Sequence, residues 1–418
     1  MQPHCHQVLD EIERWLDRDP NAGALPFLLS GDALAAVRAS HGVDDEQFEA
    51  ASTRHRAAVD RHLAPILLRI VEGGPPSPDE LDALVTASAG DPVSSAFATE
   101  AASPTEEVAE RIRLLPGLWV RFAGWWRSYF SEQAGPPPPI TDLWRLYLPL
   151  GQWIVREKRR VRPGELFMVG FNGSPGAGKT VLTNALAVLL DHLLDSETEG
   201  SAVARSGDDW YLGKADRELL RSRGYDPGRP GVSNRALPGT HELDWLTRNL
   251  REMTTSTPHS VIRMGNFDKK ADDQPAGADR YFEVRGKVGV FLFDLWFAGA
   301  ETDIDPMQLP DGLQRRVAEQ LREWRPVFER MDALWAFDWP PREAMLRERE
   351  AQERLVEQRR GGRGMSQQDL GAFMDYMIER AWDWQLTSPV PPAAAVTFRC
   401  WRDTHHRVIA VRSQGGAS

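Results

Sequence analysis

The stretch Gly173-Ser-Pro-Gly-Ala-Gly-Lys-Thr180 matches the phosphate-binding loop pattern G-x-x-x-x-G-K-[ST] at every fixed position. Its glycines let the backbone wrap around a triphosphate and point N–H groups inward. In such a loop Lys179 reaches the β- and γ-phosphates, and Thr180 offers its hydroxyl to Mg²⁺. The residues expected to hold the nucleotide are Gly173, Ser174, Gly176, Ala177, Gly178, Lys179 and Thr180.

The residues on either side of this loop support the same interpretation. Residues 166–171 form a short apolar run that is typical of a buried strand, and residues 181–194 carry leucines and alanines at helical spacing. A helix that begins directly after the loop completes an anion site, because its first N–H groups lack partners within the helix. Strand, loop and helix together predict a site for a nucleoside triphosphate.

Composition limits the classes of protein that fit. The chain has 418 residues, of which 41% are hydrophobic and 27% charged, as in globular proteins. Its net charge of −11 argues against a nucleic-acid or anionic-membrane partner, and no apolar run reaches the roughly 18 residues that a membrane span needs. The first residues do not resemble a signal peptide, and two cysteines, Cys5 and Cys400, fit a cytoplasmic, reducing setting. His4, Cys5 and His6 are spaced too closely to converge on one metal ion.

Residues 1–139 are expected to form a helical N-terminal region, and residues 140–418 the nucleotide-binding domain. Ser77-Pro-Asp-Glu80 and Ser103-Pro-Thr-Glu106 each have the pattern of a capped helix start. The proline run at 136–139 is a stiff spacer and marks the expected boundary. Helical spacing places five aromatic side chains on one face, which is either packed in the core or a surface for a partner or a second copy of the chain; they are Trp119, Phe122, Trp126, Tyr129 and Phe130.

After the loop, strand-like and helix-like segments alternate, which predicts an α/β fold with a mostly parallel sheet covered on both faces. The expected strands are 166–171, 203–206, 261–264, 288–293, 334–337, 396–399 and 408–411. A charged segment at 342–359 is expected to be a solvated helix. The arrangement is that of a three-layer P-loop NTPase domain preceded by a helical region.

Three carboxylates follow predicted strands and are therefore expected at the edge of the sheet where ligands bind. Asp294 ends the most apolar strand and suits a metal ligand, together with Thr180. Asp208, beside Asp209, suits a base that orients an attacking hydroxyl. Phosphoryl transfer needs such parts around the phosphate loop, so the predicted cofactors are ATP and Mg²⁺.

From about residue 143 to residue 411 the sequence resembles D-glycerate 3-kinases, which are P-loop kinases related to uridine kinase, phosphoribulokinase and bacterial pantothenate kinase. Several short motifs occur in the family's order. They are Leu146-Tyr-Leu-Pro-Leu150, Ser206-Gly-Asp-Asp-Trp-Tyr-Leu212, Arg235-Ala-Leu-Pro-Gly-Thr-His241, Phe267-Asp-Lys269 with Asp279-Arg280, Phe293-Asp-Leu-Trp296, Arg349-Glu-Ala-Gln-Glu353 and Met365-Ser366.

The resemblance implies roles for the matching positions. Asp208 would be the base toward the acceptor hydroxyl, Asp294 would help to place Mg²⁺, and the lid residue Arg349 would approach the transferring phosphoryl group beside Lys179. The implied acceptor is a small, acidic molecule, with D-glycerate the leading candidate. The residues assigned to its pocket are Asp209, Tyr211, Arg235, His241, Asp268, Lys269 and Arg280.

The chain departs from the family's pattern mainly where the pocket is shaped. Pro175 stands where glutamine is usual, Trp210 replaces phenylalanine, Asp294-Leu295 replaces Glu-Gly, and Glu348 replaces the lid tryptophan. These changes leave open a kinase for a different hydroxy acid, polyol or other hydroxyl compound. A nucleotide-dependent switch or chaperone is a further alternative, although the chain lacks a guanine-reading N-K-x-D segment after a late strand.

Overall fold

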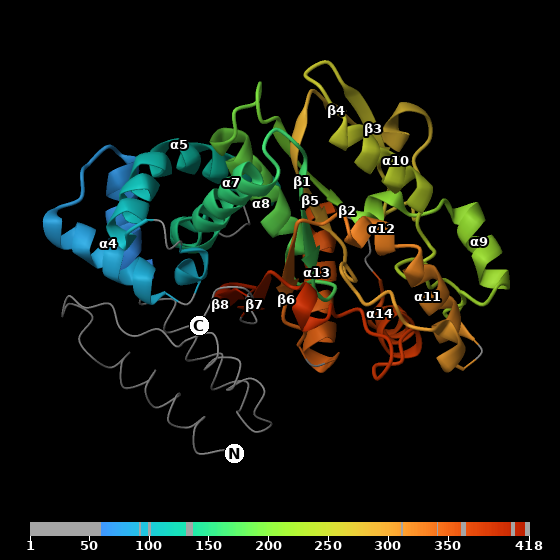
Figure 1. Cartoon of the computed structure of the whole chain (residues 1–418). Coiled ribbons are helices and arrows are strands. Elements are labelled where there is room, and N and C mark those ends of the chain that lie inside the picture. The colour runs from blue at the N-terminus through green and yellow to red at the C-terminus, as the bar shows by residue number, and fades with distance from the viewer. Residues whose placement is uncertain are drawn as a thin grey trace. The chain divides into compact units, whose positions relative to one another are not determined.

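The structure is a computed structural model of the chain, and it describes residues 60–91, 93–98, 102–130, 137–310, 312–340, 342–360, 365–402 and 406–413. The chain divides into two compact units (Figure 1). The first contains residues 1–157, 188–193 and 398–418, and the second contains residues 158–187 and 194–397. The expected boundary at residue 139 stays a prediction. The expectations for residues 1–59, including His4, Cys5 and His6, lie outside the described residues.

The described N-terminal part of the first unit is helical, as predicted. Both predicted helix starts are confirmed: Ser77 and Glu80 form a reciprocal capping box at the start of helix α4 (Pro78–Gly90), and Ser103 and Glu106 do the same at helix α5 (Pro104–Phe130). In each case the serine hydroxyl accepts the backbone N–H three residues on, so it satisfies a donor that the helix cannot.

The aromatic face of α5 is buried unevenly. Phe122 and Trp126 are buried, and the Phe122 ring lies 5.2 Å from that of Tyr147, whereas Tyr129 is 38% exposed. The expectation that this face packs in the core is therefore confirmed for Phe122 and Trp126. An oligomer formed through this region stays a prediction.

The remaining elements of the first unit include an antiparallel strand pair. Strand β7 begins two residues later than predicted, and its partner β8 extends two residues further than predicted. Cys400 lies buried in β7 and is not in a disulfide. The bounds are η1 (Ser94–Phe97), α6 (Ile140–Asp142), the π-helical turn η2 (Leu143–Tyr147), α7 (Leu148–Val161), β7 (Phe398–Arg402) and β8 (Val408–Ser413).

The second unit is built on four parallel strands in the order β2-β5-β1-β6. Parallel neighbours that are not consecutive in sequence need crossover connections, and helices supply them here. The α/β prediction with a mostly parallel sheet is thus confirmed. The bounds are β1 (Phe167–Asn172), β2 (Ser201–Ser206), β5 (Val288–Asp294) and β6 (Ala333–Phe337).

Both faces of this sheet are covered. Met168, Phe291 and Phe293 belong to one apolar cluster with residues of helices α10 (Leu243–Thr254) and α11 (Leu313–Arg322). Because successive strand residues point to opposite faces, Val290 and Leu292 lie on the other face, and both are fully buried as well. Burial on both faces explains why β5 is an unbroken apolar run, and it confirms the three-layer arrangement.

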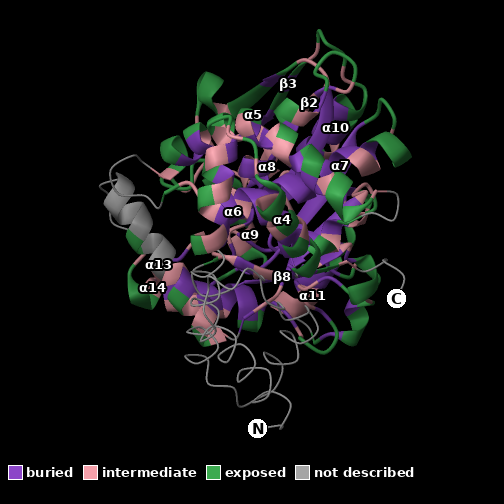
Figure 2. Ribbon diagram, turned by 90° about the vertical axis from the view of Figure 1, so that its left-hand side faces the viewer, coloured by how far each residue is buried: buried purple, intermediate pink, exposed green. Residues whose placement is uncertain are grey.

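Strands β3 (Val261–Gly265) and β4 (Tyr281–Arg285) form a separate antiparallel hairpin. In sequence it lies between α10 and β5. The residues at 261–264 were predicted to form a strand, and they do, but outside the main sheet. Residues 261–264 of β3 alternate between exposed and buried, whereas in β4 only Val284 is buried. Figure 2 shows exposed backbone, in green, around β3. Such alternation is typical of a two-stranded ribbon with one wetted face.

The remaining elements are helices and short helical turns of the second unit, except that residues 188–193 of α8 (Lys179–Leu193) belong to the first unit. The charged segment predicted as a helix at 342–359 is helix α13. Within the described ranges, no helix is both long enough and apolar enough to cross a membrane. The bounds are α8 (Lys179–Leu193), η3 (Gly207–Trp210), α9 (Lys214–Ser222), α10 (Leu243–Thr254), η4 (Gly277–Arg280), η5 (Pro306–Gln308), α11 (Leu313–Arg322), α12 (Arg325–Phe328), α13 (Arg342–Arg360), α14 (Gln367–Met374), the π-helical turn η6 (Asp375–Arg380) and η7 (Ala393–Ala395).

Candidate active site

The phosphate loop connects the buried strand β1 to helix α8, as predicted. Gly176 and Gly178 have φ angles of +89° and +88°, a region that side chains with a Cβ rarely enter, so glycine is required at both positions. Lys179 is the first residue of α8, and its Nζ donates to the carbonyl oxygens of Gly173 (2.7 Å) and Ser174 (3.0 Å). The loop thus folds around its own lysine, at the N-terminus of a helix where anions bind favourably.

Asp294 ends β5 beside this loop and is 4% exposed. Its Oδ2 accepts a hydrogen bond from the Thr180 hydroxyl (2.9 Å), and its Oδ1 accepts one from the Ser206 hydroxyl (3.1 Å). Burial raises the pKa of Asp294 above its usual value, and the charge of Lys179 opposes that rise. A carboxylate and a hydroxyl oxygen in contact are donors that suit Mg²⁺, which usually takes one or two carboxylates and completes its shell with water and phosphate oxygens.

Asp208 lies in the turn η3 that follows β2. Its Oδ2 is 2.7 Å from the Nζ of Lys269. Burial by itself would raise the pKa of Asp208, but the Lys269 ammonium and a hydrogen bond from Tyr211 outweigh it and hold that pKa well below its usual range. The charges of Asp208 and Lys269 also act on the pKa of Asp294, so these groups share one electrostatic environment with Lys179.

Asp209 pairs with a different cation. Its Oδ2 lies 3.0 Å from the Nε of Arg205 and accepts the backbone N–H of Ser206 at 3.0 Å. Burial raises the pKa of Asp209 to about 6, although Arg205 opposes the shift. Asp209 therefore caps the η3 turn that carries Asp208, and its predicted place in the acceptor pocket stays a prediction.

His241 and Tyr211 lie together near Asp208. Their rings are 4.5 Å apart, and the two residues form an isolated antiparallel bridge. His241 is 6% exposed, and among the described residues neither of its ring nitrogens has a hydrogen-bond partner with normal geometry. The carbonyl oxygen of the nearby Leu237 instead accepts hydrogen bonds from Thr240, from its backbone N–H at 3.1 Å and from its hydroxyl at 2.7 Å. Burial lowers the pKa of His241 to about 4, so its ring is neutral.

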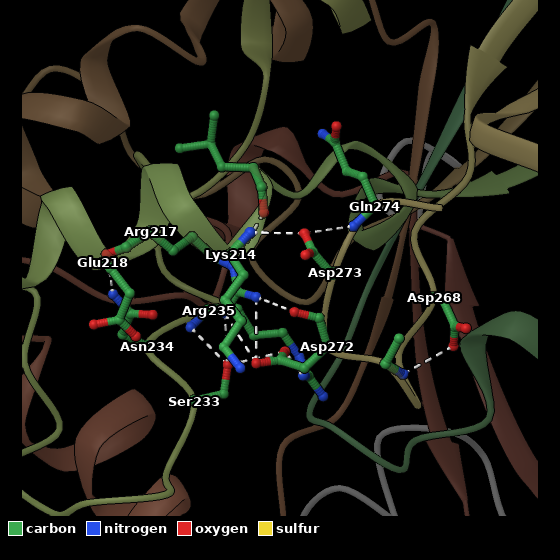
Figure 3. A network of polar contacts seen from close by, with 12 residues as sticks. Lys214, Arg217, Glu218, Ser233, Asn234, Arg235, Asp268, Asp272, Asp273 and Gln274 are labelled. Atoms are coloured by element: carbon green, nitrogen blue, oxygen red, sulfur yellow. Dashed lines mark hydrogen bonds and ion pairs between the residues drawn. The ribbon is translucent and has the colours of Figure 1, made fainter. Parts of the chain in front are cut away.

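Arg235 belongs to a polar network that also contains a fully buried arginine (Figure 3). The guanidinium of Arg217 donates to the Leu212 carbonyl (3.0 Å) and to the Ser233 hydroxyl (2.9 Å), and it also donates to Asp272. Arg235 forms an ion pair with the same Asp272 carboxylate. One carboxylate is therefore shared by two guanidinium groups, so Arg217, Arg235 and Asp272 together carry an excess of positive charge, whereas Asp268 and Asp273 of the same network are acidic. The Tyr211 hydroxyl lies within the influence of this positive charge: burial raises the pKa of Tyr211, and the charges of Arg235 and Arg217 oppose that rise.

Two predicted pocket residues have other contacts. The Asp268 carboxylate accepts the backbone N–H groups of Lys270 (2.8 Å) and Ala271 (3.2 Å), and so stabilises the turn that presents Lys269. Arg280 lies 3.4 Å from Glu242 and stacks over the ring of Trp245. Direct contact of Asp268 or Arg280 with an acceptor stays a prediction.

Helix α13 carries Arg349 past the phosphate loop. A Cβ built on Gly176 would lie 3.6 Å from the Glu348 Cβ and 3.8 Å from the backbone nitrogen of Arg349. The predicted lid residue is therefore next to the loop in the structure, although the two are far apart in sequence.

The structure also brings in residues that had no predicted role. Ser206 contacts Asp294, and Asp272 pairs with both Arg217 and Arg235. Asn172, at the end of β1, is fully buried, and its amide bonds to three carbonyls and to the indole of Trp339. Ser206 belongs to the motif at residues 206–212, but its contact with Asp294 depends on which strand lies beside β2. No local sequence pattern reveals that neighbour.

The chain is similar in sequence to a curated kinase, and in fold to the solved structure of the YGR205w protein. No protein-family profile matches the chain. The uncharacterized kinase mug58 of Schizosaccharomyces pombe is 25% identical over 241 residues, which span 53% of this chain and 82% of that protein. Among solved structures, the YGR205w protein aligns with a TM-score of 0.50 at 18% identity over 63% of this chain and 95% of its own. D-glycerate 3-kinase from Cryptococcus neoformans var. grubii aligns with a TM-score of 0.48 at 17% identity over 64% and 99%.

Proposed function

We propose that this chain, which has the fold of the P-loop kinases, transfers the γ-phosphate of ATP to a hydroxyl group of a small acidic metabolite. D-glycerate, through its 3-hydroxyl, is the leading candidate for the acceptor. The observation that carries the proposal is the position of Asp208. Its carboxylate shares one electrostatic environment with Lys179 and Asp294 of the phosphate site, and it faces a lysine rather than open solvent.

Each part of phosphoryl transfer has a residue in this arrangement. The acceptor's hydroxyl oxygen forms a bond to the γ-phosphorus while the bond from that phosphorus to the β,γ-bridging oxygen breaks, and Asp208 accepts the hydroxyl proton. Lys179 and the loop amides hold the phosphates, and Arg349 stabilises charge on the transferring group. Thr180 and Asp294 would hold Mg²⁺, which neutralises charge on the β- and γ-phosphates when it is bound.

The charges around Asp208 favour an acidic acceptor. Lys269 is 51% exposed in its side chain, so it can meet a ligand as well as Asp208. The excess positive charge shared by Arg217, Arg235 and Asp272 lies near the Tyr211 hydroxyl. Guanidinium groups bind carboxylates with two parallel hydrogen bonds, which gives direction as well as affinity. A hydroxy acid would place its carboxylate toward these cations and its hydroxyl toward Asp208.

The proposal is tested by measuring ADP release with D-glycerate, other hydroxy acids, polyols and nucleosides as acceptors. We expect a large stimulation by at least one hydroxy acid and little by nucleosides. Nucleotide binding is measured in parallel by titration calorimetry. Intact nucleotide binding without stimulation by any acceptor would contradict a kinase function, while stimulation by neutral polyols alone would contradict the acidic acceptor.

A further inference from the structure

Ser206 lies beside Asp294 because of the register of two parallel strands. It is the last residue of β2, and it pairs directly with Asp294, the last residue of β5. Its hydroxyl donates to Asp294 Oδ1 at 3.1 Å, while the Thr180 hydroxyl donates to Oδ2 at 2.9 Å. The two oxygens of one carboxylate are therefore held from opposite sides by two hydroxyl groups.

The same hydroxyl also fixes the turn that carries Asp208. Ser206 is the N-cap of η3, where its Oγ accepts the backbone N–H of Asp208 at 3.4 Å. Its own N–H donates to Asp209 Oδ2 at 3.0 Å, which completes a reciprocal capping box. One side chain thus connects the turn of the proposed base to the proposed metal ligand.

Asp294 needs such a restraint for a physical reason. Rotation about the bond to a carboxyl group is soft, so a carboxylate keeps one orientation only where its neighbours hold it. Asp294 is nearly fully buried, and hydrogen bonds to its charged form also offset the cost of removing that charge from water. Groups that hold a metal-binding carboxylate in this way typically change metal affinity or activity by about 10- to 100-fold when they are removed.

We propose that Ser206 is a positioning residue for the metal site: its hydroxyl holds Asp294 Oδ1 so that Oδ2 stays beside the Thr180 hydroxyl. The inference rests on the proposed function, because it assumes that Thr180 and Asp294 bind the magnesium of a magnesium–nucleotide complex. Ser206 itself touches neither the nucleotide nor the acceptor in this role.

The test compares the dissociation constant of ADP with Mg²⁺ and with EDTA, measured by titration calorimetry. In wild-type protein we expect Mg²⁺ to tighten ADP binding. In Ser206→Ala we expect the tightening of ADP binding by Mg²⁺ to be about tenfold smaller, while the affinity for ADP in EDTA stays unchanged. We also expect this variant to need a higher Mg²⁺ concentration for half-maximal turnover. Ser206→Thr keeps the hydroxyl and is expected to restore the gain. If Ser206→Ala does not fold, Ser206→Cys keeps the volume with a weaker donor and should show the same loss.

Ser77→Ala is the matched control. Ser77 is also an N-cap in a capping box, at the start of α4, so its loss removes the same type of helix contact from the first unit. We expect it to lower the melting temperature slightly and to leave the Mg²⁺ gain in ADP affinity unchanged.

The outcomes separate the inference from the proposed function. A wild-type protein that binds ADP equally well with Mg²⁺ and EDTA would contradict the proposed metal site and the inference with it. A normal gain in wild-type protein that Ser206→Ala fully keeps would overturn the inference alone. The inference is also overturned if Ser206→Ala weakens ADP binding equally in both conditions, because that result indicates a general loss of structure.

Discussion

The Nζ of Lys269 lies 2.7 Å from Oδ2 of Asp208, and this ion pair decides the protonation of the proposed base. Burial alone would raise the pKa of Asp208, and Lys269 reverses that effect. Asp208 is therefore ionised throughout the physiological range, so the proposed base can accept a proton at any of these pH values.

Removing Lys269 should make activity depend on pH in the acid range. In Lys269→Met, burial is no longer opposed, so the pKa of Asp208 rises and the active, ionised form is lost as pH falls. We expect kcat/KM of this variant to decline on the acid side of a profile from about pH 5 to 9, where the wild type stays flat. Lys270→Met, at the exposed neighbouring position, should keep the wild-type shape. The same flat profile in Lys269→Met would show that Lys269 does not control Asp208.

Lys179→Ala and Asp208→Asn should each lower kcat by about 100-fold or more, which is the scale for removing a charge-stabilising group or a positioned base. Asp208→Asn should still bind ATP, because Asp208 contacts Lys269 rather than the phosphate loop. Lys287→Ala and Asp226→Asn change the same residue types on the surface and should keep wild-type rates. An active Asp208→Asn enzyme would exclude Asp208 as the base.

Arg349→Ala should lower kcat by about 100-fold and weaken ATP binding much less, because charge on the transferring group develops mainly in the transition state. Single-turnover rates and ATP titrations measure the two effects. Arg347 is exposed on the same helix and, two residues away, faces a different direction, so Arg347→Ala should change neither quantity. An equal loss of ATP affinity and rate in Arg349→Ala would indicate a role in binding ATP instead.

His241→Phe should leave the protein stable at neutral pH, because among the described residues the imidazole makes no hydrogen bond that the substitution would remove. The KM for the acceptor should rise several-fold if a nitrogen of His241 bonds to it, the scale of one hydrogen bond. The exposed His259 provides the control, His259→Phe. An unchanged KM would remove His241 from the acceptor pocket.

The same variant tests the pKa of His241. A pKa lowered to about 4 in the folded state means that the unfolded chain takes up the proton first as pH falls. The contribution of His241 to stability is thus fully present above about pH 6.5 and is lost between about pH 6.5 and 4, by roughly 3 kcal/mol. In denaturant unfolding, the free energy of unfolding of the wild-type protein should therefore decrease relative to that of His241→Phe as pH falls through that range. A constant difference would show that His241 titrates normally.

Asn172→Ala should lower the free energy of unfolding by about 3 kcal/mol or more, because it leaves the Trp339 indole and three carbonyls without this buried partner. Trp339→Phe removes only the indole donor and should cost about 1–2 kcal/mol. Urea unfolding measures both. Equal losses in the two variants would contradict a role of Asn172 beyond its bond to Trp339.

Much of the site could be predicted because its parts follow local patterns. The motif at 173–180 requires a loop between a strand and a helix, and the apolar run before Asp294 requires a strand buried on both faces. Parallel strands then bring their carboxyl ends to one edge of the sheet, so Asp208 and Asp294 could be expected near the loop. The capping boxes at Ser77 and Ser103 were equally readable, since they depend on residues only three positions apart.

Other contacts could not be predicted because they join residues that are distant in the chain. The strand at 261–265 looked like part of the main sheet, yet within the described residues it pairs with β4 alone, since a short strand carries no signal for its partner. The ion pair of Arg235 with Asp272 and the bonds from Asn172 to Trp296, Ala298 and Pro389 depend on loops that no periodic pattern places.

The sequence by itself determined the phosphate-loop motif and the α/β class, and it supplied the residue types that we propose for phosphoryl transfer, because each is specified by backbone requirements and periodicity within a short segment. Only the tertiary structure decided how the carboxylates are held. The register of β2 on β5 places Ser206 against Asp294, and the turn at Asp268 brings Lys269 to Asp208. The state of a buried charge depends on the few groups that touch it, and these come from separate strands and loops that only folding brings together.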